Sequence, residues 1–169
     1  MLNENTFSYG GFTYPEYPAT RENMENMSLE AQYDELMEIG FDGIKMLEGK
    51  PTEHKRIGKS LNHPAFNKLY EQMEKDGTHL LMHVNDPDEF WDLKRAPDWA
   101  VENGWTYTDG SFASYEEIQA QTIKILESYP NLSLTLAHFF FCSKEPEILE
   151  KLFALYPNLC VDLTPGGEM

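Results

Sequence analysis

The chain has 169 residues, of which 41% are hydrophobic and 25% charged, and its formal net charge is −16. This length and composition are typical of one folded domain with a sizeable core. A chain with this much negative charge repels phosphate backbones and anionic lipid. We therefore expect neither nucleic acid nor a membrane surface as a partner. The sequence shows no apolar run of about 18 residues and no basic-then-apolar leader. Two cysteines are too few for a disulfide framework, so a cytoplasmic protein is the default expectation.

A helix followed at once by an apolar strand occurs four times, after an opening strand expected at residues 6–14. The helical patterns lie at 28–40, 63–77, 116–128 and 145–155. Ser28 is a favourable N-cap residue, and Gly40 and Gly77 are favourable helix terminators. The strands that follow these helices contain GIKML, THLLMHV, LSLTLAH and LCVDL.

The last two units are related by an internal repeat. Tyr-Pro-Asn-Leu stands at 129–132 and again 27 residues later at 156–159. Strands that alternate with amphipathic helices predict a parallel sheet with helices packed outside it. We therefore expect an α/β fold of parallel (β/α) repeat units, a partial TIM barrel of about five strands, as a single domain over 1–169. The apolar strand cores are expected to be covered on both faces.

One segment breaks this rhythm. Residues 84–115 are rich in aromatic and acidic side chains and contain no helix–strand unit. A long insertion after a strand's carboxyl end is usually a lid or a binding loop. The aromatic side chains either wall a pocket or form a small core of the insertion itself. The polar segment 50–59, which contains His54, is expected to be a surface loop.

Two histidines occupy corresponding places, because His83 and His138 each lie near the carboxyl end of an expected strand. In a parallel barrel these ends converge on one mouth, where two imidazoles can share a metal ion. We interpret both as metal ligands, with the alternative that each is a hydrogen-bonded core histidine.

Other polar residues near these strand ends are candidates for binding or catalysis. Lys45 is a charge inside an apolar strand, and it either anchors a substrate anion or pairs with a carboxylate. Asp162 is the acidic counterpart in the last strand and a candidate catalytic residue. The predicted substrate-binding residues are Lys45, Asn85, Trp91 and Trp105.

Four stretches, GFDGIKML, HPAFNKLYEQMEKDGTHLLMHVNDP, YPNLSLTLAHFFF and YPNLCVDLTPGGEM, resemble the amidohydrolase-2 branch of the metal-dependent hydrolase superfamily. Members of that family are (β/α)8 barrels, and the resemblance matches their third through seventh strands. It implies that His83 is the fifth-strand metal ligand and that His138 is the sixth-strand histidine facing metal and substrate. It also implies a divalent ion, often zinc, that activates water or polarises a carbonyl.

The resemblance implies hydrolysis of C–N or C–O bonds in a small organic substrate, or decarboxylation. The family's first-strand His-x-His pair and last-strand aspartate have no counterparts here, so we expect an incomplete active site with weak or absent metal binding. Two alternatives stay open. One is a non-catalytic binding module that keeps the barrel scaffold, and the other is a homo-oligomer whose bare sheet edges pair.

Overall fold

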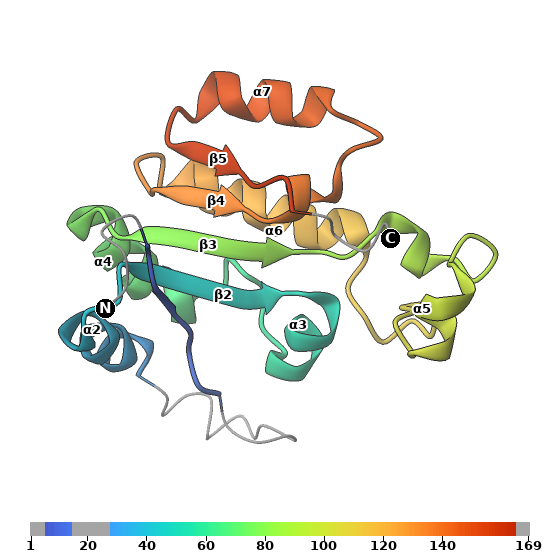
Figure 1. The fold of residues 1–169 in the computed structure, drawn as a ribbon, viewed down its shortest axis with the longest axis horizontal. Coiled ribbons are helices and arrows are strands. Elements are labelled where there is room, and N and C mark those ends of the chain that lie inside the picture. Colours follow the sequence, from blue (N-terminus) through green and yellow to red (C-terminus); the bar gives the residue numbers. More distant parts are fainter. Residues whose placement is uncertain (1–5, 15–27, 165–169) are drawn as a thin grey trace.

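Five parallel strands form one sheet, in the order in which they occur in the chain (Figure 1). This computed structural model describes residues 6–14 and 28–164. The strands are β1 (Tyr9–Gly10), β2 (Gly43–Gly49), β3 (His79–Val84), β4 (Leu134–Leu136) and β5 (Leu159–Val161). The expected α/β fold with five parallel strands is confirmed. The opening strand is shorter than expected, because only two residues of the segment 6–14 pair with β2.

Helices connect the strands, and all four expected helices are present. The α-helices are α2 (Leu29–Ile39), α3 (Pro51–Ile57), α4 (Asn67–Asp76), α5 (Asp98–Glu102), α6 (Tyr115–Ser128) and α7 (Glu147–Leu155). Short 3-10 helices lie at η1 (Pro64–Phe66), η2 (Asp88–Trp91) and η3 (His138–Phe141). In the described part of the chain no helix is long and apolar enough to cross a membrane.

The helix-capping residues predicted from the sequence begin and end α2 as expected. The Ser28 hydroxyl accepts a hydrogen bond from the backbone of Ala31 at 3.1 Å, and Gly40 ends α2 with φ of 100°. The helix α3 was not expected, because the segment that contains His54 reads as a polar loop. Pro51 explains this helix, since a proline at the first helical position has its φ already set and loses no helical hydrogen bond.

The helices pack against one face of the sheet, and Figure 1 shows α4 and α6 behind β3 and β4. The strand residues Ile44, Met46, Leu80, Met82, Leu134 and Leu136 are fully buried in one core with side chains of these helices. Alternate residues such as Lys45, Leu81 and Thr135 point to the other face and are only partly buried. The expectation that both faces are covered is therefore wrong for the described residues, whose strands alternate between a buried and an open face.

The aromatic insertion forms a small core of its own. Phe90, Ala100 and Tyr107 are buried together, and Trp91, Trp99 and Phe112 pack against them. A short helix, α5, lies within this segment. The structure therefore shows the second of the two alternatives for the aromatic side chains, a local core.

A buried carboxylate lies at the end of β2. Glu48 is 4% exposed, and its Oε1 atom accepts a hydrogen bond from the hydroxyl of Tyr14. Its Oε2 atom has no hydrogen-bond partner among the described residues. Burial raises the pKa of Glu48 from an ordinary 4.5 to about 7, although the Tyr14 hydrogen bond acts in the opposite direction.

This shift predicts that the protein loses stability as the pH rises. The folded state holds the Glu48 proton up to about pH 7 and the unfolded state releases it near pH 4.5, so the free energy of unfolding falls between these values. The fall is at most about 3 kcal/mol. We expect Glu48→Gln to remove most of this dependence in urea unfolding at pH 5 and pH 8, while the exposed Glu102→Gln retains it. Equal pH dependence in the wild type and in Glu48→Gln would contradict the prediction.

Candidate functional site

The two histidines predicted from the strand ends lie side by side. β3 and β4 pair in register, with Leu80 opposite Leu134 and Met82 opposite Leu136. The backbone bond from Ala137 N–H to the Met82 carbonyl, 2.9 Å long, continues this pairing past the end of β4. His83 directly follows Met82, and His138 directly follows Ala137, so the two histidines lie at neighbouring strand ends. Their ring centroids are 5.0 Å apart, with an angle of 73° between the ring planes.

The chain leaves β4 through a left-handed turn. Four consecutive residues, His138 to Phe141, have φ between 51° and 56°. This region costs residues with side chains roughly 1–2 kcal/mol each, so the surrounding structure must impose it. Phe140 is fully buried in the core, and the Phe139 N–H donates to the Asp162 carbonyl at 2.8 Å. The turn brings the Phe141 ring to 5.7 Å from His83 and 5.3 Å from His138, as ring centroids.

The hydrogen bonds of His138 indicate which ring nitrogen carries its proton. Nδ1 lies 3.2 Å from the Thr164 carbonyl oxygen and 3.0 Å from the Thr164 hydroxyl. A carbonyl oxygen only accepts, and the hydroxyl donates its own proton to Asp162 Oδ1 at 2.5 Å. The Nδ1 atom is therefore the donor, and Nε2 keeps the lone pair when the ring is neutral.

Asp162 holds this arrangement from β5. Its Oδ1 atom accepts from the backbone N–H of His138 at 2.8 Å and from that of Thr164 at 3.1 Å. Partial burial raises the pKa of Asp162, but the hydrogen bonds from Thr164 and His138 outweigh it and hold that pKa below its ordinary value. Asp162 is thus an ionised anchor for the segment that carries His138.

Lys45 lies on the open face of the sheet, opposite Leu81 of β3. Burial lowers the pKa of Lys45, and the negative charges of Asp162 and Glu48 act against that effect. No ion pair within 4 Å joins its ammonium group to another described residue. The structure thus places Lys45 near Asp162, on the same face of the sheet.

His83 belongs to a buried polar cluster that the sequence did not reveal. Its Nε2 atom lies 3.3 Å from Asp86 Oδ1, and Lys50 Nζ lies 3.0 Å from both Asp86 oxygens. The Tyr107 hydroxyl donates to Asp86 Oδ2. Burial lowers the pKa of His83, and the Asp86 carboxylate acts in the opposite direction. In the sequence, the one signal for this cluster was the Asn-Asp-Pro-Asp run at 85–88, shortly after His83.

The three remaining predicted binding residues lie elsewhere. Asn85 is fully buried, and its amide donates to the Tyr115 carbonyl at 3.0 Å. Trp91 packs in the small aromatic core and donates from its ring to the Ala113 carbonyl. Trp105 is 43% exposed and contacts the Trp99 ring edge. Their predicted contact with substrate stays a prediction.

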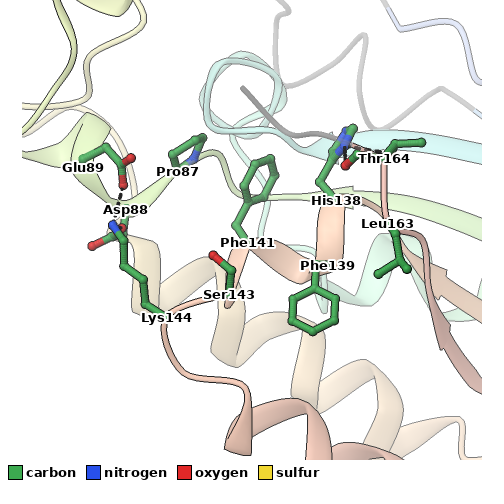
Figure 2. Close-up of a pocket in the computed structure, with 10 residues that line it drawn as sticks. All are labelled: Pro87, Asp88, Glu89, His138, Phe139, Phe141, Ser143, Lys144, Leu163 and Thr164. Atoms are coloured by element: carbon green, nitrogen blue, oxygen red, sulfur yellow. Dashed lines mark hydrogen bonds and ion pairs between the residues drawn. The ribbon is translucent and has the colours of Figure 1, made fainter. Parts of the chain in front are cut away.

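A cavity of about 350 Å³ adjoins His138 (Figure 2). It is lined by Pro87, Asp88, Glu89, His138, Phe139, Phe141, Ser143, Lys144, Leu163 and Thr164. Figure 2 shows Lys144 reaching Asp88 and Glu89 on one side of the cavity and His138 beside Thr164 on the other. The Lys144 ammonium lies 2.8 Å from Asp88 and 2.9 Å from Glu89, so one positive charge lies between two negative charges on this side of the cavity. The remaining wall is mainly apolar, which suits a small organic ligand.

The described residues do not complete a metal centre. Within 6–14 and 28–164 no group of three or more His, Cys, Asp or Glu side chains is placed to hold an ion. Catalytic zinc sites use three protein ligands and an open position. Metal binding by His83 and His138 stays a prediction, and the described residues supply no third ligand for it.

Comparisons with known proteins support the fold. The chain matches no protein-family model and no curated protein. An uncharacterized TIM-barrel protein from Bordetella bronchiseptica has a similar solved structure, with a TM-score of 0.54 and 19% sequence identity. The similarity covers 93% of this chain and 43% of that chain, so this chain spans less than half of the barrel protein it matches. The likeness is one of fold, and the resemblance to the amidohydrolase-2 branch stays a hypothesis.

The two-histidine geometry predicts weak zinc binding that depends on both rings. After equilibrium dialysis against micromolar zinc, we expect substoichiometric metal by elemental analysis, because only two nitrogen donors are in place. The double variant His83→Ala, His138→Ala should bind none, whereas His63→Asn, which changes a ring bonded to the Ala65 backbone, should match the wild type. Stoichiometric zinc in the double variant would show that the metal binds elsewhere.

Proposed function

We propose that this chain supplies the central strands of a hydrolase active site that acts on a small organic substrate. The bonds we expect it to cleave are C–N or C–O bonds of an amide, ester or lactone, with decarboxylation of an aromatic acid as the related reaction. The observation that supports this is the contact of His83 and His138 at the carboxyl edge of a parallel sheet, beside a cavity of about 350 Å³. In barrel enzymes this edge carries the catalytic residues.

His138 is assigned as the general base. With its Nδ1–H held by Thr164, its Nε2 atom can accept a proton from a water molecule, and the resulting hydroxide adds to the substrate carbonyl. The same nitrogen then returns the proton to the leaving amine or alkoxide. Asp162 supports this role through Thr164, which links the carboxylate to the ring. Asp162 thus positions His138 and has no assigned contact with substrate.

Substrate binding is assigned to the cavity and to Lys45. The rings of Phe139 and Phe141 and the side chain of Leu163 offer an apolar wall for a flat or aliphatic group. Lys45 has a cationic head with no ion-pair partner among the described residues, which suits a substrate carboxylate or a developing oxyanion. The divalent ion stays part of the proposal, with His83 and His138 as its ligands from this chain; the His138 Nε2 atom would then be a ligand, and the ion would supply the activation of water in place of that atom. Because the described donors are incomplete, the steps above use side chains alone.

A binding module without turnover is the second candidate. The observation that favours it is the burial of His83, which is 9% exposed and is covered by the rings of His138 and Phe141. A histidine that reaches solvent so little contributes to packing and orientation before it contributes to catalysis. Binding of an aromatic acid or ester without conversion, measured by calorimetry and product analysis, would favour this candidate.

The proposal predicts a large loss of activity on removal of the His138 Nε2 atom. His138→Asn is the informative change, because asparagine tolerates a left-handed φ and can still donate to Thr164. Against a panel of aryl amides, esters, lactones and aromatic acids, we expect the best wild-type rate to fall by about 10²- to 10⁴-fold.

The matched control is His54→Gln, in α3, whose ring contacts Gln121 and does not line the cavity. This variant should retain the wild-type rate. An undiminished rate in His138→Asn would remove His138 from the mechanism. Binding without turnover in the wild type would replace the hydrolase by the binding module.

A further inference from the structure

We propose that Asp86 is a positioning residue that fixes His83 in one tautomer, with the proton on Nε2, and that Lys50 and Tyr107 hold Asp86 in place. The inference deepens the proposed function, on which its catalytic meaning rests. It concerns a buried cluster that brings together three separate segments. These are the start of α3, the residues after β3 and the aromatic insertion.

The hydrogen bonds leave the Asp86 carboxylate little freedom. Lys50 donates to both oxygens at 3.0 Å, Tyr107 donates to Oδ2, and His83 Nε2 lies 3.3 Å from Oδ1. Asp86 is 4% exposed and Tyr107 is 3% exposed, so water competes little for these contacts. A buried carboxylate with partners on both oxygens is held much more firmly than one at the surface.

The backbone is shaped to make this contact. Asn85 has φ of 65°, a left-handed conformation that reverses the chain directly after β3. The reversal brings Asp86 back to His83, three residues earlier. Gly49 allows β2 to approach closely, because a Cβ atom there would lie 2.3 Å from the His83 carbonyl oxygen. The Asn85 N–H donates to the Gly49 carbonyl at 2.8 Å and closes the junction.

The tautomer follows from the chemistry of the partners. An ionised carboxylate only accepts hydrogen bonds, so a neutral His83 facing Asp86 through Nε2 must carry its proton there. The lone pair then lies on Nδ1, which is the nitrogen left to act as a base or a ligand. Carboxylates that bond the far nitrogen of a functional imidazole orient the ring and raise its basicity. If Asp86 served only to hold the fold, its ion pair with Lys50 would be enough. His83 would then not be required to adopt a single tautomer.

Nuclear magnetic resonance can test this without a substrate. We would record long-range ¹H–¹⁵N correlation spectra of the uniformly ¹⁵N-labelled chain at pH 8, where an ordinary histidine is neutral. The expected result is a protonated Nε2 and an unprotonated Nδ1 for His83 in the wild type. Asp86→Ala should shift His83 to the other tautomer or to a mixture.

Two controls separate this effect from a general disturbance. Asp88→Ala removes a carboxylate of the same loop that contacts Lys144 and Arg95 but not His83, and it should leave the His83 signals in place. Within each variant, the signals of His79, whose ring bonds Ser133 and Thr135, should stay constant.

The proposal is overturned if wild-type His83 carries its proton on Nδ1, or if folded Asp86→Ala keeps the Nε2 proton. If Asp86→Ala does not fold, the wild-type spectrum alone still decides the question, because an Nδ1 proton there overturns the proposal. The result is independent of turnover. A failure of the hydrolase proposal leaves the tautomer measurement valid, and a failure of the tautomer leaves the role of His138 to be judged by its own variant.

Discussion

The site depends on the parallel pairing of β3 with both β2 and β4. β3 lies parallel to β4 in one register and parallel to β2 with a register shift between Met46 and Gly49, and the carboxyl ends of all three strands meet at one edge of the sheet. That edge receives His83 from β3, His138 from just after β4 and Lys50 from just after β2. A shift of one residue in β3 would turn His83 toward the helices, because successive residues of a strand face opposite sides.

Strain at this edge is offset by the core beneath it. The left-handed turn from His138 to Phe141 costs roughly 4–8 kcal/mol in total. Burial of the Phe140 ring contributes about 2–3 kcal/mol. Three hydrogen bonds of 2.8 Å also hold the turn. The N–H groups of His138 and Phe139 donate to Asp162, and the Tyr115 hydroxyl donates to the Phe141 carbonyl; each bond contributes about 1 kcal/mol. These sums are similar, so the turn persists only while Asp162 and the core hold it, as is typical of strained backbone at functional sites.

Charge is distributed unevenly between the surface and the site. The chain as a whole is strongly acidic, yet its carboxylates at the carboxyl edge are bound by cations or by hydrogen-bond donors. Asp86 pairs with Lys50, Asp88 pairs with Lys144, and Asp162 accepts backbone and hydroxyl protons. Lys45 is the cation beside this edge whose head group has no ion-pair partner among the described residues. The cavity wall beside Lys144 keeps a net negative charge, because two carboxylates there face one ammonium group.

The sequence by itself determined the order of helices and parallel strands, the caps at Ser28, Gly40 and Gly77, and the neighbourhood of His83 and His138. These features follow from periodicity and from the common direction of parallel strands, which are local rules. Tertiary structure decided the left-handed turn, the sheet face that residues 6–14 and 28–164 leave open, and the aromatic insertion's own core. It also decided the cluster of Asp86 with Lys50 and Tyr107, since these residues lie far apart in sequence. No local pattern records such contacts, because they form only when three separately folded segments meet at one buried point.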